Sequence, residues 1–165
     1  GKHTGLSASL LSQLENGKLI PTLPTLARIA MVFDVGVDYF FTDKRRKVAF
    51  SVVRARERIR FPDRPDAVKP AYFFECLAFS ATEKSLHAYI AEFPRREPGE
   101  VTPHFHLGAE MLHLLEGRLV IRIEDQDHEL AAGDTAYFDA AEPHSYRGVS
   151  KKPARALVVT APPRS

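Results

Sequence analysis

Apolar residues recur at helical spacing near the start of the chain. The leucines of residues 5–18 lie three or four positions apart, Ser7 precedes them as a candidate N-cap, and Asn16-Gly17 follows as a stop. A second apolar stripe follows in residues 21–36, which predicts a second helix after a short turn.

The second helix is expected to begin at Thr22 or Thr25, and a third short piece at Asp38. The predicted apolar face of the second helix consists of Leu26, Ile29, Ala30 and Phe33. Three short helices are too little for a stable unit, so we expect that part of this unit is missing in front of residue 1.

The spacing of apolar residues along the chain changes after the basic segment 43–47. Short, partly alternating segments rich in β-branched and aromatic residues follow, separated by glycine and proline, with no helical pattern between them. The predicted strands are 48–59, 71–80, 85–93, 118–125, 135–140 and 154–161. This pattern predicts an all-β sandwich or barrel.

The chain therefore divides into a helical domain at 1–42, a linker at 43–50 and a β domain at 51–165. The basic run 44–47 is either a solvated linker, which is the simpler interpretation, or a phosphate-facing patch beside the helices. Residues 1–50 hold seven Lys/Arg against four Asp/Glu, whereas the remainder is almost neutral. The positive end could meet a polyanion.

Composition restricts the class of protein. With 165 residues, 44% hydrophobic and 27% charged, the chain can form one or two globular domains. Cys76 is the only cysteine, which excludes an internal disulfide framework and suits a reducing cytosol, and its apolar neighbours predict a core position. We find no signal peptide and no apolar run of membrane-spanning length, so we expect a cytoplasmic protein with no membrane partner.

Histidines at alternate positions suggest a metal site. On a strand, His104 and His106 would project from the same face, and Glu110 can return to that face after a short break. His144, after a turn-rich stretch, could supply a fourth ligand from a neighbouring strand. Such a set suits one divalent ion per chain, zinc first, with iron, manganese, nickel or cobalt possible. The alternative is a group of surface histidines on a half-polar strand.

Residues 98–117, "PGEVTPHFHLGAEMLHLLEG", resemble the first motif of the cupin family, and residues 133–148 resemble the second. The gap after Gly99 is four residues where the family usually has five, and Asp139 and Ala141 replace the usual Pro and Gly. Gly148 stands where the family often has Asn. The resemblance covers about residues 51–165. It implies a double-stranded β-helix, a jelly-roll barrel, that holds a metal in its mouth through His104, His106, Glu110 and His144.

Residues 5–41 resemble the second half of a lambda-repressor-like helix-turn-helix domain of the XRE family. Gly5 would be the turn glycine and 7–15 the recognition helix. The first two helices of the family are absent, and without them we expect weak DNA binding. The resemblance implies DNA contacts by the exposed positions Ser7, Ala8, Ser9, Ser12 and Gln13, and by Asn16 and Lys18 at the backbone.

Together the two resemblances imply a one-component transcription regulator. A homodimer would bind a double-stranded DNA operator, and the barrel would bind a small-molecule effector that shifts DNA binding. Proteins that resemble this architecture regulate amino-acid, polyamine, sulfur or other small-metabolite genes in bacteria. By parity with the ligands and by alternation, the effector pocket is expected to include Tyr89, Leu112, Leu114 and Tyr146, whereas His113 points away.

The alternative is a small metal-dependent cupin enzyme of the dioxygenase or isomerase type, in which an open metal position would act on a substrate. Residues 5–41 favour the regulator over the enzyme, because a stand-alone enzyme has no need of a recognition helix. A further alternative is that the metal at the barrel mouth has a purely structural role.

Overall fold

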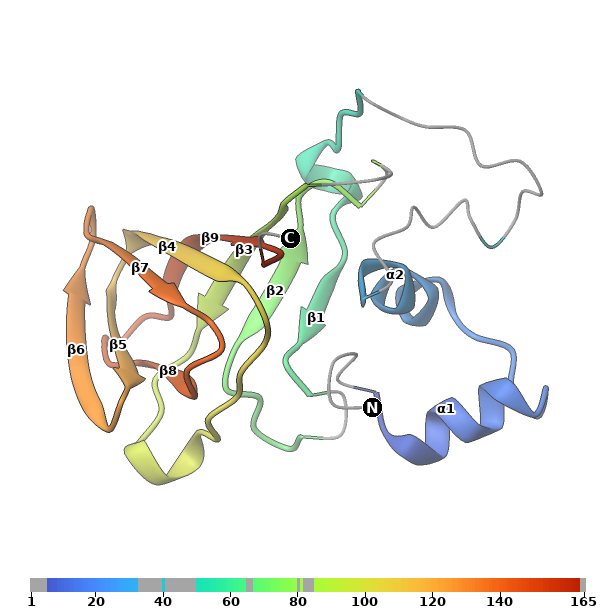
Figure 1. The fold of residues 1–165 in the computed structure, drawn as a ribbon, viewed down its shortest axis with the longest axis horizontal. Helices are drawn as coiled ribbons and strands as arrows, with labels where there is room; N and C mark the ends of the chain where they lie inside the picture. Colours follow the sequence, from blue (N-terminus) through green and yellow to red (C-terminus); the bar gives the residue numbers. More distant parts are fainter. Residues whose placement is uncertain are drawn as a thin grey trace.

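The computed structural model of the protein describes residues 6–32, 40, 50–64, 67–79, 81 and 85–163. Two short helices precede a β-rich body (Figure 1). This order confirms the predicted fold class, helices followed by a jelly-roll of strands. All of the helical piece expected from Asp38 except Phe40, and nearly all of the predicted linker 43–50, lie outside the described residues.

Helix α1 (Ala8–Glu15) has the ends that its sequence predicts. The Ser7 hydroxyl accepts a hydrogen bond from the Leu10 backbone N–H at 3.1 Å, which satisfies a donor of the first turn. Asn16 is the C-cap, and Gly17 follows with φ +65°, a left-handed conformation that ends the helix at little cost for glycine. The predicted cap and stop are therefore confirmed.

Helix α2 (Leu23–Val32) begins after Thr22, whose hydroxyl accepts from the Thr25 backbone N–H at 3.4 Å. Of the two candidate caps, Thr22 is thus the one that the structure uses. Ala27 and Ala30 are buried, as is Arg28, which the apolar pattern did not mark. Neither described helix has the length and apolar character needed to cross a membrane.

The strands form two antiparallel sheets. One has the order β1-β2-β3-β9-β4-β7 and the other the order β6-β5-β8. The strands are β1 (Arg60–Pro62), β2 (Phe73–Cys76), β3 (His87–Phe93), β4 (Ala109–Glu116), β5 (Arg118–Ile123), β6 (Gln126–Ala131), β7 (Thr135–Asp139), β8 (His144–Gly148) and β9 (Ala154–Ala161). Two 3₁₀ turns, η2 (Ala55–Glu57) and η3 (Pro98–Glu100), precede β1 and β4.

The core lies between the two sheets, because its buried residues come from β3, β4 and β9 of the first sheet and from β5, β6 and β8 of the second. Strand β4 shows how alternation builds it. Glu110, Leu112 and Leu114 are buried, whereas Met111 and His113, which alternate with them, are more exposed. The predicted parity of Glu110 with the two leucines is confirmed, and Cys76 is buried as predicted.

The predicted strand at 48–59 is wrong over its described part. Residues 50–59 contain no strand, and the chain joins the sheet only at β1. The reason is local, since the Glu57 carboxylate accepts from the Arg54 backbone N–H at 2.8 Å and closes a turn there. Exposed charges at Arg54 and Arg56 also give this segment no apolar face to bury.

Strands β6 and β8 are among those that the sequence pattern did not predict. Strand β6 is polar and mostly exposed, so it lacks the hydrophobic alternation that marks a strand. It pairs with β5 through a tight turn at Glu124 and Asp125, which have φ of 48° and 59° without the glycine that usually marks such turns. Strand β8 lies between β5 and the loop that carries His104.

Candidate metal centre

Backbone hydrogen bonds fix the histidine segment before β4 against the start of β8. The His104 N–H donates to the His144 carbonyl at 2.8 Å, and the His144 N–H donates to the His104 carbonyl at 2.9 Å. Two residues on, the His106 N–H donates to the Ala140 carbonyl at 2.9 Å. This segment is extended and paired by a single bridge, not part of a regular strand, so alternation alone does not place the imidazoles.

Gly108 carries the bend that returns the chain to the site. Its φ of +99° is a conformation that side chains disfavour, and a Cβ here would lie 1.9 Å from the Ala161 carbonyl oxygen. Its own carbonyl accepts from the Ala140 N–H at 2.9 Å. The break that the sequence suggested between His106 and Glu110 therefore depends on a glycine.

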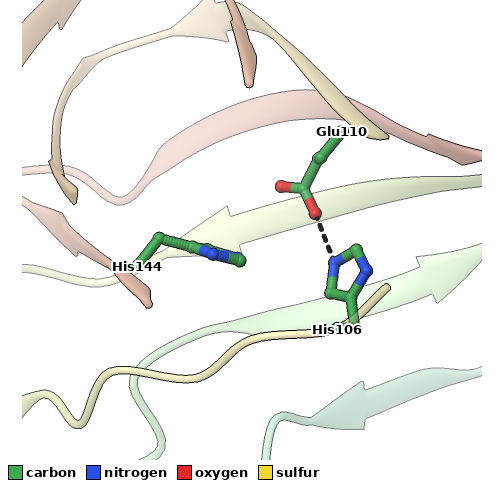
Figure 2. A group of neighbouring side chains, drawn as sticks. All are labelled: His106, Glu110 and His144. Carbon is green, nitrogen blue, oxygen red and sulfur yellow. Dashed lines mark hydrogen bonds and ion pairs between the residues drawn. The ribbon is translucent and has the colours of Figure 1, made fainter. Parts of the chain in front are cut away.

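Three of the four predicted ligands converge. One potential ligand atom from each of His106, Glu110 and His144 lies within 4.8 Å of the others. Figure 2 shows the three side chains pointing toward one another, with His106 and Glu110 joined by an interaction of 3.0 Å between Nε2 and Oε2. Glu110 and His144 are buried, at 4% and 0% exposure, whereas His106 is partly exposed.

The His144 imidazole is held in the protonation state that a metal requires. Its Nδ1 lies 2.8 Å from the Glu142 carbonyl oxygen, and because a carbonyl only accepts, Nδ1 carries the proton. Burial lowers the pKa of His144, so the ring stays neutral and Nε2 keeps its lone pair. This Nε2 is buried and has no hydrogen-bond partner among the described residues. A neutral imidazole whose other nitrogen is fixed by a carbonyl is the usual form of a metal-ligating histidine.

His106 and Glu110 form a hydrogen-bonded pair. The hydrogen bond to Glu110 raises the pKa of His106, and its Nδ1 also donates, at 3.3 Å, to the Leu107 carbonyl. The second Glu110 oxygen, Oε1, accepts from the Tyr146 hydroxyl. Burial raises the pKa of Tyr146 well above its usual range, so the phenol remains a donor. Both carboxylate oxygens of Glu110 thus have a hydrogen-bond partner.

His104 contacts the set from one side. Its ring centroid lies 4.4 Å from that of His144, but it is not among the groups whose ligand atoms lie within 4.8 Å of one another. Burial, and secondarily His144, lower the pKa of His104 to about 4, so this imidazole is neutral too. Its role as a fourth ligand stays a prediction.

The predicted effector-pocket residues belong to the core between the sheets or pack against it. Leu112, Leu114 and Tyr146 belong to the buried cluster between the sheets, and Tyr89 packs against that cluster. Sequence reasoning missed Tyr72, whose ring centroid lies 5.9 Å from Tyr146 and 6.1 Å from His104. Its alternation with the inward-facing aromatic residues of 71–76 was the available signal. The contact of these residues with an effector stays a prediction.

The predicted DNA-contacting residues are all exposed. They are Ser7, Ser9, Ser12, Gln13, Asn16 and Lys18, and Ala8 beside them is exposed as well. On the other side of α1, Leu10, Leu11 and Leu14 are half-buried. The Gln13 amide donates at 3.4 Å to the Ser9 hydroxyl, a local bond that a base could replace. The geometry leaves this face of α1 open for a partner.

Comparisons with known proteins agree with both halves of this architecture. The cupin domain family matches residues 95–160, and the helix-turn-helix family HTH_3 matches residues 1–40. The HTH-type transcriptional regulator PuuR of Escherichia coli (strain K12) is 26% identical over 156 residues, covering 89% of this chain and 76% of that protein.

Two solved structures have the same fold. An HTH_3 family transcriptional regulator from Vibrio cholerae is 27% identical, with a TM-score of 0.56 over 98% of this chain and 83% of that one. Hydroxypropylphosphonic acid epoxidase from S. wedmorenis is 21% identical, with a TM-score of 0.58 over 96% of this chain and 85% of that one, a likeness of fold alone. The chain thus combines a helix-turn-helix segment of the HTH_3 type with a cupin domain, and over most of its length it is similar to proteins named as transcriptional regulators.

Proposed function

We propose that this regulator binds one divalent metal ion and a small-molecule effector in its cupin barrel, and that the effector modulates operator binding by the helix-turn-helix. The observation that carries the proposal is the buried, neutral Nε2 of His144, which has no described hydrogen-bond partner and faces Glu110 and His106. A buried polar atom without a partner is costly, and a metal would satisfy it.

Zinc is the first choice for the ion, because two imidazoles and a carboxylate are a set that zinc prefers. A bound ion would supply a Lewis-acidic position at which an effector donor could coordinate. His106, Glu110 and His144 would hold it, while Tyr146 and the Glu142 carbonyl orient Glu110 and His144. We propose a sensory role and not catalysis, since the two relatives above 25% identity, PuuR and the Vibrio cholerae protein, are named as transcriptional regulators, whereas the epoxidase that also matches both halves is 21% identical.

The proposed DNA interface is the exposed face of α1, with Gln13 reading a base and the serines, Asn16 and Lys18 contacting the backbone. We further propose a homodimer, because operators of helix-turn-helix proteins are usually two-fold and the spacing of half-sites follows the protein dimer. Light scattering at micromolar concentration checks this, and a strictly monomeric species would contradict it.

Gln13→Ala and Glu110→Ala are expected to separate the two activities. Gln13→Ala should weaken operator binding by about 1–3 kcal/mol, because a bidentate base contact is lost, and should leave metal binding intact. Glu110→Ala should do the reverse: operator binding persists and the response to effector disappears. The measurement is titration of a DNA duplex selected from a random pool by the full-length wild-type protein, with and without the metal and candidate metabolites.

Glu15→Ala serves as the control for Gln13→Ala, since Glu15 is exposed on the same helix but outside the proposed contact set. A Gln13→Ala protein with wild-type affinity would contradict the DNA interface. A Glu110→Ala protein that still responds normally to effector would show that the metal site does not sense it.

Zinc affinity is expected to decrease as the pH falls, beginning above the ordinary histidine value of 6.5. The hydrogen bond to Glu110 raises the pKa of His106, and zinc must displace the proton on its Nε2. The pKa values of His144 and His104 are lowered, so these rings stay neutral over the same range and do not compete. Below the His106 pKa, affinity should fall about tenfold per pH unit.

Calorimetric zinc titration between about pH 5.5 and 8, in buffers of different ionisation enthalpy, measures both the affinity and the protons released. One proton per zinc is expected on the acidic side. An affinity that stays constant across this range would rule out His106 as a ligand.

A further inference from the structure

A buried arginine joins the helical segment to the barrel. Arg28 lies on α2 and is only 3% exposed, which is unusual for a cationic side chain. Its guanidinium donates to the carbonyl of Pro62 at the end of β1. Figure 1 shows α2 lying beside β1 at the edge of the six-stranded sheet.

Two aromatic rings of the barrel also contact this cation. The guanidinium carbon lies 5.3 Å from the ring centroid of Phe61 and 5.4 Å from that of Phe74, within the range of cation–π attraction. The two rings lie 5.6 Å apart and come from the paired strands β1 and β2. A planar guanidinium, weakly hydrated and able to donate in several directions, suits such a site better than an ammonium group.

The contact favours one position of α2 on the barrel. Sliding or lifting α2 would take the guanidinium away from the Pro62 carbonyl and from the two rings, and the loss of such partners is costly for a buried cation. The apolar residues beside it, Ala27 and Ala30, could tolerate several alignments. Arg28 is therefore the contact of α2 that depends most on its position on the barrel.

The same rings lead to the candidate metal centre. Phe74 lies 6.3 Å from Tyr72 between ring centroids, and Tyr72 lies 5.9 Å from Tyr146 in an edge-on contact. The Tyr146 hydroxyl donates to Glu110. A continuous series of packed side chains thus runs from the guanidinium to a proposed ligand. Packed contacts of this kind can carry coupling, but coupling requires a measured energetic effect.

We propose that Arg28 is a positioning residue that docks the helix-turn-helix segment on the β1–β2 edge, and that the Phe74–Tyr72–Tyr146 contacts transmit the state of the metal centre to it. The second half rests on the proposed function. The alternative route runs along the chain itself, through residues 43–54 that join the two domains and lie mostly outside the described residues. A ligand can shift the docking only by the difference in its affinity for the docked and released states.

Amide hydrogen exchange of the full-length protein, read by mass spectrometry with and without zinc alone, tests both halves. Arg28→Ala should raise the exchange rate of α2 amides at least tenfold without zinc and leave those of β3 and β9 unchanged. Zinc should change α2 exchange in the wild type but not in Arg28→Ala, whose zinc affinity should differ from that of the wild type only by the factor by which zinc shifts the docking.

Arg60→Ala is the matched control. Arg60 also lies over a ring, 3.7 Å from the Phe73 centroid, and pairs with Glu92, but it is exposed on the outer side of β1. The α2 amides of this variant should exchange as those of the wild type do, with and without zinc. Arg28→Lys, which keeps the charge without the planar fork, should give an intermediate effect and decides the question if Arg28→Ala does not fold.

The outcomes separate the two proposals. If zinc binds and α2 in the wild type does not respond, or Arg28→Ala responds as the wild type does, the transmission is overturned. If zinc does not bind the wild type, the proposed metal function fails, and the docking is decided by the zinc-free comparison alone. Equal α2 exchange in the wild type, Arg28→Ala and Arg28→Lys would overturn the docking.

Discussion

Replacing His144 with alanine is expected to abolish zinc binding at the candidate centre. His144 is the proposed ligand whose protonation state and direction are most fully fixed, by the Glu142 carbonyl at 2.8 Å and by complete burial. Loss of an outer-sphere partner alone commonly costs about 10–100-fold in metal affinity, so loss of the ligand itself should cost about 100-fold or more. Zinc titration followed by elemental analysis of the gel-filtered protein measures it.

His113→Ala is the matched control, because His113 lies on β4 but on the face opposite Glu110, where its Nδ1 contacts the Thr135 hydroxyl at 2.8 Å. It should bind zinc as the wild type does. His144→Gln keeps much of the volume, which distinguishes a lost ligand from a collapsed core. Full zinc occupancy in both His144 variants would show that the ion, if present, is held elsewhere.

Gly108→Ala is expected to destabilise the metal-free protein by about 3 kcal/mol or more, the largest effect of any single methyl group that we predict. Two costs combine, a left-handed φ of +99° and a Cβ that would lie 1.9 Å from the backbone oxygen of Ala161. The atoms that this Cβ would meet belong to the backbone of Ala161 and Pro162, which cannot turn aside as a side chain can. The bend before Glu110 must therefore move. Urea unfolding followed by circular dichroism measures the change.

Gly133→Ala isolates the conformational part of this cost. Gly133 has nearly the same φ, +97°, but nothing lies within 4 Å of its Cβ position. It should lose only about 1–2 kcal/mol. We also expect Gly108→Ala to weaken zinc binding, since the bend places Glu110 beside His106, whereas Gly133→Ala should not. Equal destabilisation by the two substitutions would show that the close approach to Ala161 does not limit the fold.

The sequence by itself determined the features that depend on neighbouring residues. The cap at Ser7 and the stop at Gly17 follow from bonds and dihedral angles within one turn, so residue types reveal them. Alternation placed Glu110, Leu112 and Leu114 on one buried face, because successive side chains of a strand point to opposite sides. The spacing of the histidines and glutamate was likewise enough to propose a metal site.

Only the tertiary structure decided which groups meet. His144 is far from His106 in sequence, and the backbone bridge between residues 104 and 144 brings their segments together. The structure also separated the three convergent ligands from His104, which sequence spacing treats as equivalent to His106. The state of each imidazole depends on carbonyls and burial that no local pattern encodes.

The strand wrongly predicted at 48–59 and the burial of Arg28, which was not predicted, also depend on residues that are far apart in the sequence. A turn closed by Glu57 outweighed the β-branched residues before it, since the segment has no neighbouring strand to bury them. Arg28 has no apolar periodicity to mark it as buried. Its carbonyl and ring partners come from β1 and β2, more than thirty residues away, and only the packed barrel places them around one cation.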